Sequence, residues 1–119
     1  MEIRRKATRG VKHKTPKISI TYPIGQFRLY KKTLQLIKID ETRQALMFDI
    51  QKDHIIVKIE DRQNDNYHIN SRSESFKTFS SKPLAEIIAN QFSLNKNGIH
   101  LLDVEQFGKN FKLTVNNKA

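Results

Sequence analysis

The chain has 119 residues, 37% of them hydrophobic and 29% charged, which favours one folded domain over a disordered polymer. It contains no Cys, so a disulfide scaffold, a thiolate metal site and a cysteine nucleophile are excluded. No apolar run approaches the roughly 18 residues that span a bilayer, and no apolar stretch follows the basic start, so we expect a cytoplasmic protein without membrane contact.

The net charge of +10 is confined to one part of the chain. Residues 1–39 contain eleven Lys and Arg and a single acid, Glu2, whereas residues 40–119 contain eleven basic and eleven acidic residues. A charge that serves only solubility would be spread out. The concentrated block indicates a polyanionic partner, and a solvated basic tail without a partner is the alternative.

Residues 1–16 show no apolar periodicity, and Gly10 and Pro16 interrupt any helix. They predict a basic flexible arm that becomes ordered on a partner. The remaining residues, 17–119, are expected to form a single domain.

The first half of that domain alternates strand and helix signals. Apolar and polar residues alternate over 17–22, a turn follows at 23–25, and a second strand is expected at 26–29. Leu34 and Ile37 suit a short helix over 31–38. Residues 45–50 and 54–59 are typical of a hairpin with a three-residue connection.

The second half shows the same signals again. After a polar loop at 60–65, short strands are expected at 66–69 and 74–79. Ser80 and Ser81 before Lys82 and Pro83 indicate a helix start, and apolar spacing predicts a helix over 82–93. A final hairpin is expected, with strands at 99–104 and 111–115 around the turn at 107–110, and the end after it is expected to fray.

The two halves align at an offset of 50, with residues 29–37 over residues 79–87. Each half reads as strand, helix, strand, strand. Few residues are identical, so a chance alignment is the alternative. The predicted fold is therefore α+β, with mostly antiparallel strands, two short helices and an internal pseudo-two-fold repeat.

The sequence contains no recognisable catalytic or metal-binding motif. The four His are scattered without the spacing of a zinc site, and no Gly-rich loop leads into a helix. The carboxylates from Asp61 to Asp65 lack the Gly and the final Glu of a calcium loop. We therefore expect a protein that is not an enzyme and needs no metal or cofactor.

Cationic and aromatic residues are what remain. Arg28, Lys31 and Lys32 flank one strand-to-helix turn, where a phosphate could sit at the helix start, and Tyr30 lies among them. An aromatic ring can stack on an unpaired base, although ordinary packing is the alternative for Tyr30. Ser80, Ser81 and Lys82 form the equivalent turn of the second half. The candidate nucleic-acid-binding residues are Arg4, Arg5, Lys6, Arg9, Lys12, Lys14, Lys17, Arg28, Tyr30, Lys31 and Lys32.

Residues 25–59 resemble the AbrB/SpoVT swapped-hairpin family. The resemblance rests on Gly25 to Lys31, on Leu36 to Ile39, on Met47-Phe48 and on the strand from Asp53 to Lys58. The chain departs from the family pattern at Gln26, Tyr30, Leu34 and Thr42-Arg43, where the family has Arg, Pro, Arg and Gly-Asp.

That family consists of DNA-binding transcription regulators that commonly form dimers with interleaved hairpins. The resemblance implies either a homodimer or a single chain that contains both halves of such an assembly. We expect non-catalytic DNA binding, as a small transcription regulator or a mobile-element accessory protein. The alternatives are an adaptor whose arm binds an acidic protein partner and an RNA-binding module.

Overall fold

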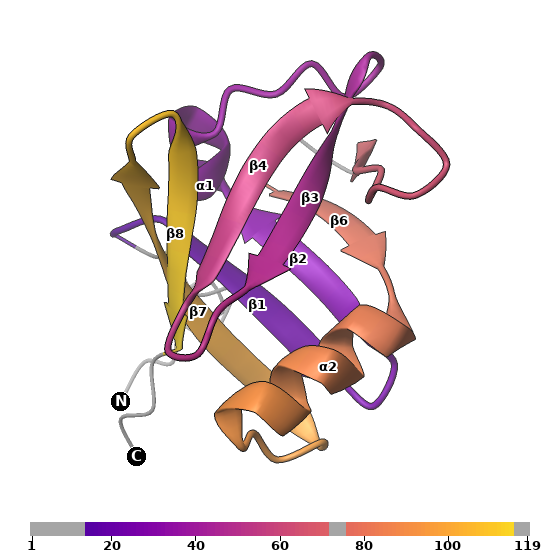
Figure 1. Ribbon diagram of the computed structural model, residues 1–119, viewed down its shortest axis with the longest axis vertical. Helices are drawn as coiled ribbons and strands as arrows, with labels where there is room; N and C mark the ends of the chain where they lie inside the picture. The colour runs from indigo at the N-terminus through magenta and orange to yellow at the C-terminus, as the bar shows by residue number, and fades with distance from the viewer. Residues whose placement is uncertain (1–13, 72–75, 116–119) are drawn as a thin grey trace, which may run out of the picture.

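The computed structural model describes residues 14–71 and 76–115 (Figure 1). Within them lie eight strands and two helices. In chain order they are β1 (Lys17–Tyr22), β2 (Gln26–Tyr30), α1 (Lys31–Leu36), β3 (Gln44–Ile50), β4 (Ile55–Asp61), β5 (Asn70–Ser71), β6 (Phe76–Ser80), α2 (Lys82–Phe92), β7 (Gly98–Phe107) and β8 (Asn110–Val115). Neither helix is long and apolar enough to cross a membrane.

The strands form one antiparallel sheet in the order β3-β4-β8-β7-β1-β2-β6-β5. The sheet curls until its two ends approach each other (Figure 1). Tyr67, just before β5, exchanges two backbone hydrogen bonds of 2.8 and 2.9 Å with Leu46 of β3. The sheet is therefore a curled half-barrel, called the barrel below, whose ends are linked by one residue pair between β3 and the segment that leads into β5.

The inside of the barrel is the hydrophobic core. Alternation along β1 and β2 buries Ile18, Ile20, Phe27 and Leu29 completely, as the sequence pattern predicts. Phe27 stacks on Phe79 of β6 with ring centroids 4.6 Å apart. Burial of each such side chain contributes about 1.5–3 kcal/mol.

The two helices cover opposite ends of the barrel (Figure 1). At one end, the Thr33 hydroxyl of α1 donates to the backbone carbonyl of Lys17. At the other end, the Tyr22 hydroxyl donates to the carbonyl of Ala85 in α2 at 2.6 Å. Helix α2 begins as predicted, because the Ser81 side chain accepts a hydrogen bond from the Leu84 N–H at 3.2 Å.

The element order supports the internal repeat. Strand, helix, strand, strand describes β2-α1-β3-β4 and again β6-α2-β7-β8. The equivalent strands β2 and β6 are neighbours, and Arg28 pairs with Thr78, its equivalent at an offset of 50. The equivalent strands β4 and β8 are also neighbours, with Ile56 opposite Lys112. A pseudo-two-fold axis through these two pairs accounts for the arrangement, and it makes β1 the equivalent of β5.

Several predicted boundaries are wrong. Helix α1 ends at Leu36 instead of residue 38, because Ile37 turns to extended backbone and is buried. Strand β4 continues to Asp61, into the predicted polar loop, because it pairs with β3 as far as Gln44. Strand β7 is longer than predicted because it pairs with both β1 and β8.

The prediction also failed between β4 and β6. Instead of a strand over 66–69, only Tyr67 pairs there, and the short strand β5 follows it. The strand expected at 74–79 is β6, which begins at Phe76, and residues 74 and 75 lie outside the described residues.

Candidate nucleic-acid interface

Strand β2 presents two of the candidate residues, Arg28 and Tyr30, on the outer face of the sheet. Because side chains alternate along a strand, Phe27 and Leu29 point into the core and Gln26, Arg28 and Tyr30 point outward. The outward residues are half-buried, so they are held by neighbours and still reach the surface.

Arg28 lies flat across the neighbouring strand. Its guanidinium carbon is 4.2 Å from the centroid of the Phe76 ring in β6, a cation–π geometry. Its cross-strand partners, Ser19 and Thr78, are both almost completely buried. The Phe76 ring therefore supports the guanidinium on the outer face of the sheet.

Tyr30 is supported as well. It pairs with Phe76 across β2 and β6, and its hydroxyl donates to the Ser19 hydroxyl at 3.1 Å. The ring is half-buried, which fits both a packing role and a partly accessible stacking surface. Phe76 was not among the predicted site residues, and its contact with Arg28 and its pairing with Tyr30 reveal it.

Lys31 and Lys32 begin α1 and are exposed. Within the described part of the chain neither forms an ion pair, and the first turn of α1 contains no acid. Helix α1 has only six residues and no side-chain cap, so its dipole is small. The positive potential at this turn therefore comes from the two ammonium groups and not from the helix start.

The residues before and at the start of β1 lie beside α1. Thr33 connects α1 to the backbone of Lys17, so Lys17 comes close to the turn that contains Lys31 and Lys32. Lys14 is exposed, whereas the Lys17 ammonium forms an ion pair with Asp103 of β7. The charge of Lys17 is thus largely compensated. Asp103 lies 86 residues further along the chain, and local sequence could not show this pair.

The arm residues Arg4, Arg5, Lys6, Arg9 and Lys12 lie outside the described residues. The described candidates, which we call the α1-end surface, are Lys14, Lys17, Arg28, Tyr30, Lys31 and Lys32. The Thr33 bond to Lys17 and the Tyr30 bond to Ser19 connect the elements that carry them, α1, β1 and β2. At the other end of the barrel, Lys82 begins α2 and is exposed. There the Ser81 hydroxyl oxygen accepts the helix-capping bond from the Leu84 N–H.

Among the described residues, no group of three His, Asp or Glu side chains is placed to hold a metal ion. No family model, no curated protein and no solved structure matches this chain. The resemblance of residues 25–59 to the swapped-hairpin regulators therefore stays a prediction.

Proposed function

We propose that the protein binds nucleic acid, with DNA as its ligand, and that it does so without catalysis. The supporting observation is the α1-end surface, where Lys14, Lys31 and Lys32 have no acidic partner among the described residues. The basic segment 1–13 ends directly before Lys14. Lysine ammonium groups neutralise phosphates regardless of base sequence.

The neighbouring rings favour nucleic acid over an acidic polypeptide. Arg28, Tyr30 and Phe76 place a guanidinium and two aromatic rings beside the lysines. A guanidinium can contact both phosphates and bases, and an aromatic ring can stack on a base. The carboxylates of an acidic peptide provide no flat ring for such stacking. A role as a transcription regulator or mobile-element accessory protein is the finer form of this proposal, and it rests on the resemblance.

A binding titration tests the proposal. Full-length protein is titrated with duplex DNA, single-stranded DNA, RNA and polyglutamate at several salt concentrations. If six phosphates are neutralised on duplex, log K should fall against log salt with a slope of about −5. Equal affinity for polyglutamate, or duplex affinity that does not depend on salt, would refute DNA binding, and tighter binding to RNA would replace DNA by RNA as the ligand.

A further inference from the structure

Strand β3 lies at one edge of the sheet, and the second half of this strand is paired on one side only among the described residues. In the β3–β4 pairing, Gln51 donates to the carbonyl of His54, so the backbone groups of every second residue from Gln51 back along β3 face β4. Those of Leu46, Phe48 and Ile50 face the other way. Leu46 is bonded to Tyr67, but Phe48 and Ile50 have no backbone partner among the described residues.

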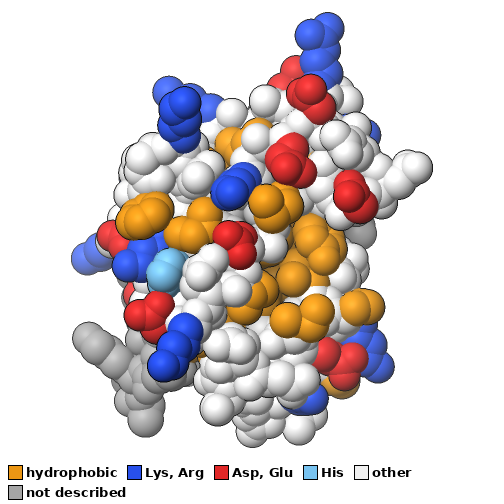
Figure 2. All heavy atoms as spheres, in the orientation of Figure 1, with side chains coloured by type: hydrophobic (Ala, Val, Ile, Leu, Met, Phe, Trp, Pro, Cys, Tyr) orange, Lys and Arg blue, Asp and Glu red, His pale blue; other side chains and the backbone are white. Residues whose placement is uncertain are grey.

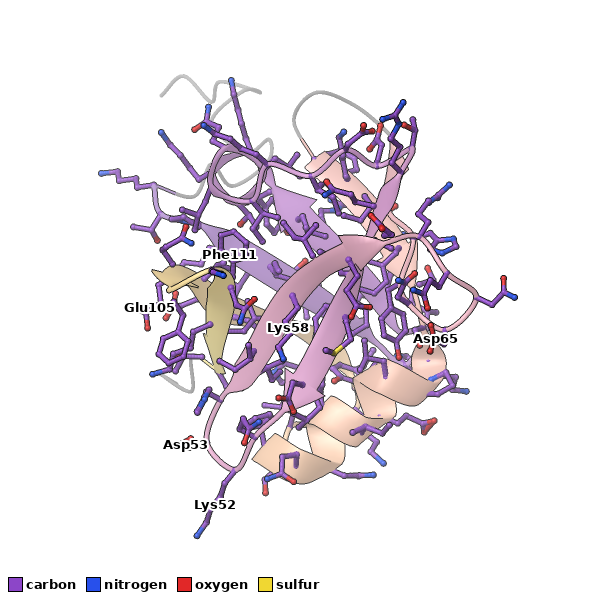
Figure 3. All side chains as sticks on the ribbon, turned by 45° about the horizontal axis from the view of Figure 1, so that its top comes forward. Lys52, Asp53, Lys58, Asp65, Glu105 and Phe111 are labelled. Carbon is purple, nitrogen blue, oxygen red and sulfur yellow. The ribbon has the colours of Figure 1, made fainter. Side chains whose placement is uncertain are left out.

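The chain leaves this edge open because of the loop between β4 and β5. Residues 62–66, with Asp65 labelled in Figure 3, run away from the sheet before the chain returns at Tyr67. Tyr67 pairs only with Leu46, so within residues 14–71 and 76–115 Met47–Ile50 borders no strand other than β4. An unpaired row of N–H and C=O groups is a template for an added strand.

The surface beside this edge is apolar. Figure 2 shows hydrophobic side chains gathered in the middle of this face, between the β3–β4 hairpin and α2. Phe48 and Ile50 are only partly buried, and Ile87 of α2 is 53% exposed. Gln91, one helical turn after Ile87, donates to the carbonyl of Lys52 at 3.2 Å, which places this flank of α2 beside the hairpin.

The pseudo-two-fold repeat shows what fits such an edge. The hairpin pairings make Phe48 equivalent to Val104 and Asp49 equivalent to Glu105. At the equivalent place in the second unit the edge is covered, because the Val104 N–H donates to the carbonyl of Pro16 at 3.2 Å. The covering segment, 14–17, carries Lys14 and Lys17, and Lys17 forms an ion pair with Asp103 on the outer face.

We propose that the open edge of β3 binds an extended, basic segment of a partner polypeptide, which adds as a strand antiparallel to β3. Its backbone bonds to Phe48 and Ile50, a cation faces Asp49, and apolar side chains on either side of that cation cover the apolar surface. Asp49 is half-buried and has no ion pair among the described residues.

A second copy of this chain fits the edge poorly. In the two-fold register that pairs both free residues, Phe48 of one β3 edge lies opposite Ile50 of the other copy, and Asp49 lies directly opposite the second Asp49. Like charges directly opposite each other destabilise a strand pair. The same carboxylate favours a basic segment, so charge complementarity decides between the two occupants.

The test uses isotope-labelled full-length protein and the peptide acetyl-Thr-Val-Lys-Val-Thr-amide. We expect the peptide to shift the amide resonances of Phe48 and Ile50 and to slow the hydrogen exchange of both N–H groups. The same peptide methylated on both Val nitrogens should have no effect. A peptide with Glu in place of Lys should bind about two- to fivefold more weakly, and Asp49→Lys should reverse that preference.

Three results would overturn the proposal. The first is unchanged Phe48 and Ile50 amides at peptide concentrations that saturate any other site. The second is equal binding of the methylated peptide. The third is a concentration-dependent dimer, seen by sedimentation without peptide, that already protects these two amides; a second copy would then be the occupant.

Discussion

At the scale of single residues, the candidate cations differ in how they are held. Asp103 compensates the charge of Lys17, and the Phe76 ring supports the Arg28 guanidinium. Lys31 and Lys32 extend into solvent. Exposed lysines have few intramolecular contacts, so their replacement should change binding without changing the fold.

The first prediction concerns three of these cations together. Replacing Arg28, Lys31 and Lys32 by Ala should lower the magnitude of the salt slope on duplex DNA by about 2.7, because each lost phosphate contact removes about 0.9. The loss should be similar on all sequences. The slope is measured by fluorescence anisotropy over a salt series.

A matched control removes three lysines that lie elsewhere: Lys52, Lys58 and Lys96. Lys52 projects from the β3–β4 loop at the α2 end, and Lys58 lies in β4 (Figure 3). Both triple variants lose the same net charge. An equal decrease in slope for both would show that only overall charge matters and that the α1-end surface is not the site.

The second prediction uses the buried hydroxyl of Tyr22. Burial raises the pKa of Tyr22 from the usual 10.0 of a tyrosine to about 12. The unfolded chain therefore ionises first, and stability is complete below pH 10 and declines between pH 10 and pH 12, by up to about 1.4 kcal/mol per pH unit. Tyr22→Phe loses the bond to Ala85 at neutral pH, at a cost of about 1 kcal/mol, but does not show this decline.

The stability difference between the parent and Tyr22→Phe should therefore shrink as the pH rises above 10. Urea unfolding of both proteins from pH 7 to pH 11.5 measures it, and the other titrating groups cancel in the difference. A gap that stays constant with pH would mean that the Tyr22 hydroxyl ionises equally easily in the folded and unfolded chains.

At the scale of elements, local sequence was enough wherever an element carries its own signals. The cap at Ser81, Pro83 and the apolar spacing after it specify α2, and alternation specifies β1. Strand β5 carries no such signal, because it is a strand only through its pairing with β6. Local sequence does not predict the backbone pairing of Tyr67 with Leu46 either, because the two residues are distant in sequence.

The same limit applied to the candidate site. The cations and Tyr30 follow from composition and position, but Phe76 and Asp103 join them only through strand register. The pairing of β1 with β7 thus places Asp103 beside Lys17 and compensates its charge. The pairing of β2 with β6 places the Phe76 ring under Arg28. Sequence patterns predict which side chains face the same way, and they do not predict which strands are neighbours.

The third prediction tests the joint between the β1–β2 turn and α2. Gly25 has a φ of +75°, and a Cβ there would lie 2.6 Å from the Lys82 Cα. Gly98 has a φ of +85° but open space around it. Gly25→Ala should therefore destabilise the protein by at least about 1–2 kcal/mol more than Gly98→Ala, since both suffer the backbone strain and only one the collision.

Chemical denaturation of the two glycine variants gives the difference. The carbonyl of Gly25 also accepts the Ser81 N–H at 2.9 Å, so a shift of the turn would disturb the first residues of α2. Equal stability losses for the two variants would mean that α2 moves away without cost and that the turn does not position it.

At the scale of the whole molecule, two adjoining parts carry the positive charge. The described residues contain fifteen Lys and Arg against ten Asp and Glu, and segment 1–13 adds five cations and one acid. The barrel itself holds the α1-end surface, which includes Lys14, the residue directly after that segment. Binding should therefore depend on both parts, whereas folding should depend on the barrel.

The fourth prediction separates the two parts by deletion. Removing residues 1–13 should leave the thermal midpoint within a few degrees of the parent, because every described core residue remains. Of the six phosphates, three are assigned to Arg28, Lys31 and Lys32, so losing the contacts of segment 1–13 should lower the magnitude of the salt slope on duplex DNA by up to about 2.7. Removing residues 1–16 should lower the free energy of unfolding by about 1 kcal/mol more, because the carbonyl of Pro16 then no longer accepts the Val104 N–H.

Calorimetry and anisotropy on both truncated proteins measure these effects. A large loss of stability in the shorter deletion would show that segment 1–13 supports the barrel, and an unchanged slope would show that the α1-end surface alone neutralises the phosphates.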